Sequence, residues 1–331
     1  MDELERRIRE ANLRPIRRET PLSPRAEQEL ATLLATPAAE SPARALRTRP
    51  RYAISLLSGM VAALVVGVLI VTGNVIPDPP ASATGLPLLE ETPVDGTINE
   101  VIDRLIMSAR KNPAEKSSST HRISYEAWSA NITVGEDASV DVFVQPQEVE
   151  RVWSDDLSGH IVMRAGAVTM GVQPEGDSPF EPGDIIDDGK FGPGEYPVLF
   201  PEEPPSTASE LRAYIAGVLG LTDSSTAGDW FKAVQDLRTD WPLTPAQNVA
   251  TLELISALPG VTAAAVTDRV GRHGIALQTE TRGGGKFRDL LIFDTVTGLL
   301  NSAEDVYLGG LDDINLPPMT VLNYTAWKAV E

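Results

Sequence analysis

The pattern of hydrophobic and polar residues divides this chain into four parts. The most apolar part is residues 52–76, where 22 consecutive residues from Tyr52 to Gly73 carry no charge. At about 1.5 Å per residue, a helix of that length covers roughly 33 Å, which is enough to cross the hydrocarbon core of a bilayer. The pattern therefore predicts a transmembrane helix over residues 52–76.

The first part, residues 1–51, shows two short amphipathic patterns. One covers residues 1–14, and the other begins at Ser23 with Pro24 in the first helical position and places Leu30, Leu33 and Leu34 on one face. Two helices of this size do not bury a core of their own. The segment is therefore either disordered or folds on a partner, and the three leucines are the candidate contact face.

Basic residues next to the apolar run predict its orientation. Arg44, Arg47, Arg49 and Arg51 precede the run, and the first basic residue after it is Arg104. Because such residues stay on the cytoplasmic side, the pattern predicts a cytoplasmic N-terminus and an extracytoplasmic C-terminal part. A signal peptide cleaved near Ala83 is the alternative, but the segment before the run is too long for one.

Small residues recur within the apolar run. Gly59, Ala63 and Gly67 lie four apart on one helix face, a spacing that lets a second helix approach closely. The spacing predicts a homodimer through this helix, although glycine and alanine are also common in membrane helices that do not pair.

The third and fourth parts are a stalk over residues 77–96 and a domain over residues 97–331. Thr97 and Glu100 have the spacing of a capping box at the start of a helix that ends before Pro113. Alternating patterns predict strands in 122–172, and residues 173–205 read as an irregular acidic excursion. Three helices are then expected between 207 and 258, the first with a capping box at Thr207 and Glu210 and the third opened by Thr244 and Pro245. A meander of strands from 261 to 328 follows.

This order of strands, helices and strands, with pairings that are mostly local, predicts an α+β class. The complete expectation is a short cytoplasmic helical segment, one transmembrane helix, and an extracytoplasmic domain of antiparallel sheet with packed helices. Trp128, Trp153, Trp230 and Trp241 are expected in the core of that domain.

Charge and composition limit the kinds of ligand and site that this chain is expected to have. The net charge is −19, but residues 1–51 hold eleven arginines against eight acids, so the remainder carries −22. An acidic exterior argues against direct nucleic-acid binding. The chain has no cysteine and three histidines, which excludes disulfides and thiolate metal sites. Gly283 to Lys286 lacks the spacing of a phosphate-binding loop and reads as a turn. With no catalytic motif, we expect neither an enzyme nor a cofactor or metal site.

Five segments carry a resemblance to a known family. They are EVERVWSDDLSG (148–159), ELRAYI (210–215), LISALPGV (254–261), DRVGRHGIAL (268–277) and LIFDTVTGLL (291–300). Through them the chain resembles an actinobacterial family of single-pass membrane proteins often encoded beside extracytoplasmic-function sigma factors. The resemblance implies an anti-sigma-like role for the cytoplasmic segment. A more distant similarity, at the level of fold only, is to half-barrel lipid-binding proteins of the periplasm.

Two functions follow from these observations. In the first, the protein is a regulator in the cell membrane that couples an extracytoplasmic sensing or binding domain to a sigma factor in the cytoplasm. In the second, it is a surface-tethered lipid- or peptide-binding protein without a signalling role. The bilayer is a partner in both, whereas the sigma factor is a partner only in the first.

Overall fold

The computed structural model describes residues 86–113, 118–129, 131–134, 140–167, 180–310 and 316–328. The chain divides into two units, Met1–Ser55 and Leu56–Glu331, and every described residue belongs to the second.

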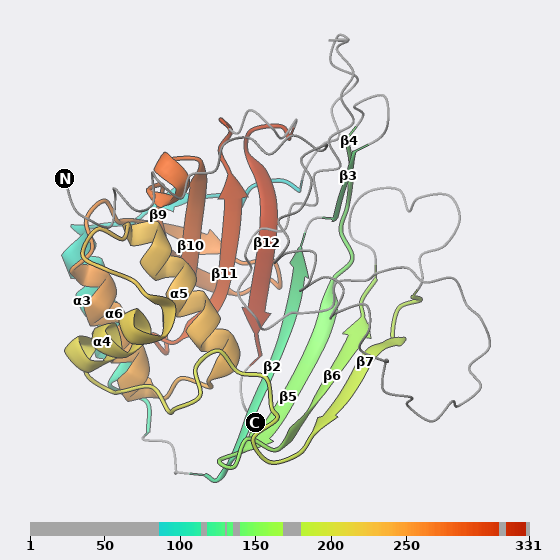
Figure 1. The fold of residues 1–331 in the computed structure, drawn as a ribbon. Helices are drawn as coiled ribbons and strands as arrows, with labels where there is room; N and C mark the ends of the chain where they lie inside the picture. Colours follow the sequence, from blue (N-terminus) through green and yellow to red (C-terminus); the bar gives the residue numbers. More distant parts are fainter. Residues whose placement is uncertain are drawn as a thin grey trace, which may run out of the picture. The chain divides into compact units, whose positions relative to one another are not determined.

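One antiparallel sheet of ten strands runs through the described residues (Figure 1). Its strands follow the order β1-β8-β9-β10-β11-β12-β2-β5-β6-β7. Their bounds are β1 Thr92–Pro93, β2 Thr120–Ser129, β5 Gln147–Ser154, β6 Gly159–Ala165, β7 Ile185–Phe191, β8 Thr262–Thr267, β9 His273–Thr279, β10 Phe287–Asp294, β11 Leu300–Tyr307 and β12 Thr320–Trp327. A separate pair consists of β3 Asn131–Val134 and β4 Val140–Phe143.

The expected class, α+β with one transmembrane helix, is wrong for the structure described. The two groups of strands were expected to pair locally, but β12 pairs with β2, so Trp327 lies opposite Tyr125 and one sheet results. Hydrophobic alternation marks a strand but does not say which distant strand it will join. Within the described ranges, no helix is both long and apolar enough to cross a bilayer. The apolar run over residues 52–76 lies outside those ranges.

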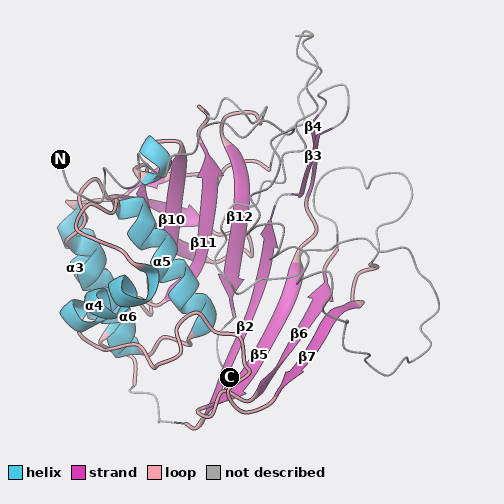
Figure 2. Ribbon diagram, viewed as in Figure 1, coloured by secondary structure: helices cyan, strands magenta, loops and turns pink. Residues whose placement is uncertain are grey.

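Four α-helices of the described chain gather on one side of the sheet (Figure 2). They are α3 Ile98–Ala109, α4 Ala208–Leu219, α5 Ala227–Asp240 and α6 Pro245–Ser256. The expected capping box at Thr97 and Glu100 is confirmed, and Thr244 with Pro245 begins α6 as expected. At α4 the Thr207 hydroxyl accepts from the Glu210 N–H, but the Glu210 carboxylate contacts that hydroxyl instead of the backbone.

Both faces of the sheet bury apolar residues. On β10, Leu291 and Phe293 face the helices and join a core that includes Trp153, Trp230 and Trp327. Leu290 and Ile292 of the same strand face the opposite way into a second core. This double burial explains why β10 contains the continuous apolar run LLIF over residues 290–293 instead of an alternating pattern. The four tryptophans expected in the core are all buried.

Residues 86–93 belong to the domain instead of forming a free stalk. Leu86, Leu88 and Leu89 pack against the second core, and β1 pairs with β8. Arg269 also donates a hydrogen bond to the Pro87 carbonyl, at 3.1 Å. The expected stalk over 77–96 is thus built into the sheet from residue 86 onward.

The excursion expected over 173–205 contains the edge strand β7. It pairs with β6, and His160 lies 2.5 Å from Asp188 across the two strands. This strand was not predicted from the sequence because it contains Gly189 and the charged residues Asp187, Asp188 and Lys190, and residues of these types are depleted in strands. They are, however, typical of an edge that resists pairing with other chains.

Candidate functional site

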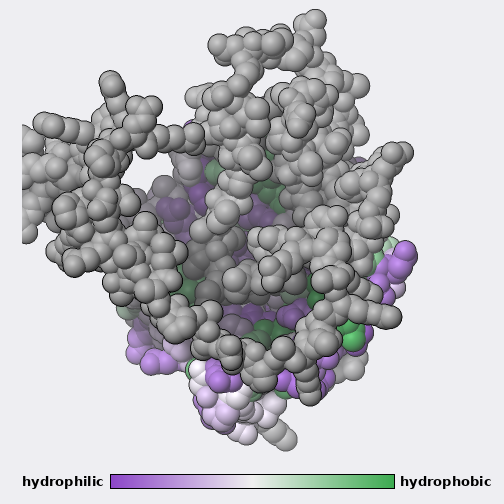
Figure 3. All heavy atoms as spheres, turned by 45° about the vertical axis from the view of Figure 1, so that its right-hand side comes forward, coloured by the Kyte–Doolittle hydropathy of each residue, from purple (hydrophilic) through white to green (hydrophobic). Residues whose placement is uncertain are grey.

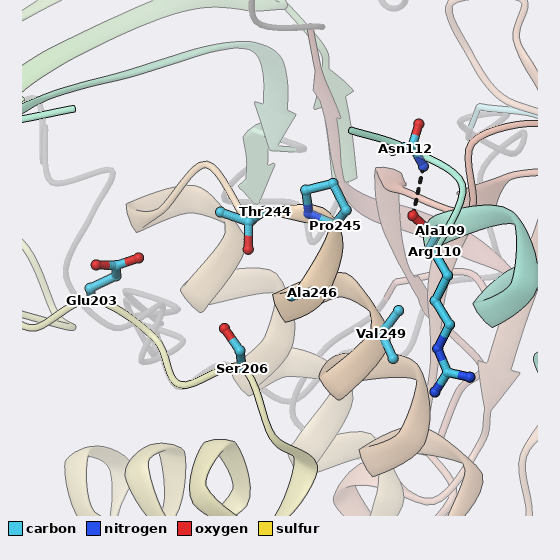
Figure 4. Close-up of a pocket in the computed structure, with 9 residues that line it drawn as sticks. All are labelled: Ala109, Arg110, Asn112, Glu203, Ser206, Thr244, Pro245, Ala246 and Val249. Atoms are coloured by element: carbon cyan, nitrogen blue, oxygen red, sulfur yellow. Dashed lines mark hydrogen bonds between the residues drawn. The ribbon is translucent and has the colours of Figure 1, made fainter. Parts of the chain in front are cut away.

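A pocket of about 420 Å³ lies between the end of α3, the loop before α4 and the start of α6 (Figure 4). Its lining comprises Ala109, Arg110, Asn112, Glu203, Ser206, Thr244, Pro245, Ala246 and Val249. This volume falls within the range of about 300–1,000 Å³ that small-molecule sites occupy. The pocket is therefore a candidate binding site of the described domain.

Local structure holds the walls of this pocket in place. The Asn112 amide donates to the carbonyls of Ala109 and Thr297, at 3.0 and 2.7 Å, and thereby fixes the chain beyond α3. The Gln247 amide donates to the Pro204 carbonyl at 2.6 Å, which fixes the loop against α6. Both anchors are side chains that bond to backbone, so the pocket is preformed.

A second candidate is a row of polar residues across five strands on the helix side of the sheet. Asp289 of β10 lies opposite Thr279 of β9 and Asp305 of β11. The row continues from Asp305 to Asn323 of β12 and Ser129 of β2. The Asn323 amide donates to Asp305 at 3.1 Å, and the Ser129 hydroxyl donates to Asn323 at 2.8 Å.

Cations from the turn and from α5 approach this row. Arg282 of the short helix η1, Arg282–Gly284, donates to Asp289 through two nitrogens and lies 3.7 Å from Asp305. Lys232 of α5 pairs with Asp236 at 2.8 Å. Gly283, Gly284 and Gly285 all have positive φ, which confirms the expected turn.

Burial raises the pKa of Asp289 to about 7 against the opposing hydrogen bonds from Arg282, and the neighbouring Asp305 adds to the rise. Two carboxyl groups this close do not both ionise readily. Asp289 therefore keeps its proton up to about neutral pH.

The surroundings of Asp289 show what this pair can do. Its Oδ2 atom is buried without a hydrogen-bond partner and faces the backbone of Gly228, where an added Cβ would collide with it. A substrate has no room between that oxygen and α5. A buried carboxyl group with a raised pKa links the stability of the fold to pH.

A third charged group joins α5 to β5. Arg151, 1% exposed, pairs with Asp240 at 2.9 Å, and it also donates to the Tyr196 hydroxyl and the Pro197 carbonyl. Asp240 accepts further hydrogen bonds from the backbone of Leu199 and Phe200. The guanidinium of Arg151 and the carboxylate of Asp240 thus have their hydrogen-bond partners within the domain, so we assign this pair a role in holding the fold together.

The three histidines lie apart, each with its own partner. His121 contacts Asp155 at 2.8 Å, His160 contacts Asp188, and His273 contacts the hydroxyl of Thr267. In the part of the chain that the structure covers, no group of three or more His, Asp or Glu side chains is arranged to hold a metal ion.

Comparison with known proteins identifies no family for this chain. No protein-family model matches it, and no curated protein matches it.

The site residues expected from sequence all lie outside the described residues. They are Leu30, Leu33, Leu34, Arg44, Arg47, Arg49, Arg51, Gly59, Ala63 and Gly67. The structure thus neither brings them together nor separates them.

The sequence pattern missed both the pocket and the charged row. A signal for the row exists, because Asp289 interrupts the apolar strand FRDLLIFD at a position that alternation assigns to the core. The pocket has no such signal, since its walls come from three segments that are distant in sequence.

Proposed function

We propose that this protein is a membrane-anchored regulator of the anti-sigma type. The apolar run over 52–76 holds it in the cell membrane, residues 1–51 hold a sigma factor in the cytoplasm, and the ten-stranded domain binds a signal outside. The proposal is supported by the leucine face, the arginine cluster and the family resemblance.

One observation carries the proposal, namely that the chain leading away from the apolar run is part of the sheet. Glu91 accepts hydrogen bonds from Gln278, at 3.0 Å, and from Arg288, at 3.4 Å, while β1 extends β8. Nine residues, 77–85, separate the run from this attachment, and they span at most about 30 Å. A conformational change in the domain on ligand binding could therefore be transmitted to the membrane segment through this short connection.

A transcription reporter tests the proposal. Replacing Leu30, Leu33 and Leu34 with Asp removes the apolar face. Transcription from promoters of the sigma factor that this segment is proposed to hold is therefore expected to rise to the level of a strain without the gene. Thr32→Asp is the matched control, because that residue lies on the opposite face of the same expected helix. A triple variant that represses as well as the wild type contradicts the proposal.

The second candidate function is a tethered binding protein without signalling. The preformed pocket favours it, because a binding site of that size needs no cytoplasmic partner. Under this function the triple leucine variant leaves transcription unchanged while ligand binding by the domain persists.

A further inference from the structure

Opposite charges stand on opposite sides of the pocket between α3 and α6 (Figure 4). Arg110, the C-cap residue of α3, lies on one side, and Glu203, in the loop before α4, lies on the other. An anionic ligand would pair with Arg110 alone, and a cationic ligand with Glu203 alone. A ligand that carries a negative charge at one end and a positive charge at the other can pair with both side chains.

The guanidinium of Arg110 is available to such a ligand. Among the described residues its one ionic partner is Glu253, 3.1 Å from a single nitrogen, and the two side chains are 63% and 41% exposed. An exposed pair of this kind contributes little to stability. Because Arg has five N–H donors in a planar fork, the same group can take a carboxylate on its other edge.

Glu203 is equally open. Within the described chain its one hydrogen bond comes from the Gln247 amide at 3.4 Å, and that amide makes a much shorter bond to Pro204. The carboxylate therefore keeps acceptor sites for an ammonium group.

Groups suited to a peptide bond lie between the two charges. The first N–H groups of a helix have no partner within it. At the start of α6, Thr244 accepts from the N–H groups of Gln247 and Asn248, and Pro245 has none. This leaves the Ala246 N–H as the open donor of that turn in the part of the chain described, with the hydroxyls of Thr244 and Ser206 beside it.

The remaining lining of the pocket is apolar. Ala109, Pro245 and Val249 form it but are themselves buried, so the ligand meets mainly the polar groups of the pocket. Elsewhere the surface seen in Figure 3 mixes hydrophilic and hydrophobic residues over the described parts.

From this arrangement we propose that the pocket binds a short peptide of two or three residues with free termini. Glu203 receives the ammonium group, Arg110 receives the carboxylate, and the Ala246 N–H meets a carbonyl between them. The inference rests on the proposed function in one respect, because it names the ligand class of the binding domain.

Calorimetry on the full-length protein in detergent tests this inference, with trialanine as the probe. We expect saturable binding of free trialanine and weaker binding of its N-acetylated and C-amidated forms. Both protein groups are solvent-exposed, so each modification should lower affinity by about two- to fivefold. Equal affinity for the modified peptides, or no saturation at about 10 mM peptide where a Kd of about 1 mM is measurable, overturns the inference.

Two variants assign the ends of the peptide. Glu203→Gln should weaken binding of trialanine about two- to fivefold but leave binding of the N-acetylated form unchanged. Arg110→Gln should weaken binding of trialanine by a similar factor but leave binding of the amidated form unchanged. Glu253→Gln is the control, because it removes the competing partner of Arg110 and should not weaken binding. If both variants affect all three peptides alike, the assignment is wrong. Sigma-factor binding is measured without peptide, so failure of this inference is distinguishable from failure of the proposed function.

Discussion

Replacing Asp289 with Asn tests whether the charged row couples folding to pH. The pKa of Asp289 rises from its ordinary 3.8 to about 7 on folding. Because the folded state binds the proton more tightly, Asp289 lowers stability progressively as pH rises from about 4 to about 7, with no further loss above that range. About three pKa units correspond to as much as about 4 kcal/mol.

Asn resembles the protonated acid and keeps an oxygen to accept from Arg282. We therefore expect Asp289→Asn to match the wild type near pH 4 and to exceed its free energy of unfolding by up to about 4 kcal/mol at pH 8. Asp103→Asn, at an exposed position on α3, is the matched control and should follow the wild type at every pH.

Tryptophan fluorescence during urea unfolding measures this difference directly. All five tryptophans lie in the described domain and are buried, so the signal reports that domain alone. Other buried acids change stability with pH too. The effects of acids that do not contact Asp289 cancel when the variant is compared with the wild type, and the measured difference belongs to Asp289 together with Asp305. Parallel pH profiles for the two proteins, or a variant that is less stable at pH 8, would refute the reasoning.

Three further predictions follow from the packing. Gly298→Ala should cost at least about 1–3 kcal/mol in urea unfolding, because φ is +65° and a Cβ would overlap the Leu105 carbonyl. Asp240→Ala should cost about 3–5 kcal/mol by leaving Arg151 buried without its counter-charge, and a loss below about 1 kcal/mol would contradict that role. Leu88→Asp should speed amide exchange over residues 88–92 while changing global stability by less than about 1 kcal/mol. Unchanged exchange would show that the leucine does not hold this segment.

Most helices and strands of the described domain could be predicted from local pattern. Caps at Thr97 and Thr244 mark helix starts because the residue types that satisfy free N–H groups are few. Alternation marks β2 and β5, since one face of each is more buried than the other.

The pairing of β12 with β2 could not be predicted, and this explains the wrong fold class. Their partners are about 200 residues apart, and nothing in either strand specifies the other. The edge strand β7 was missed because charged residues and glycine serve there to prevent pairing. The pocket was missed for a related reason, as it exists only where three distant segments meet.

Direct binding between the full-length protein and the sigma factor that the proposal assigns to it tests the central claim. The regulator account predicts that the two proteins co-purify from detergent extracts, and that the combined Asp substitutions at Leu30, Leu33 and Leu34 abolish co-purification while Thr32→Asp preserves it. Absence of any interaction with the wild-type protein, or equal binding by the triple variant, would contradict the account.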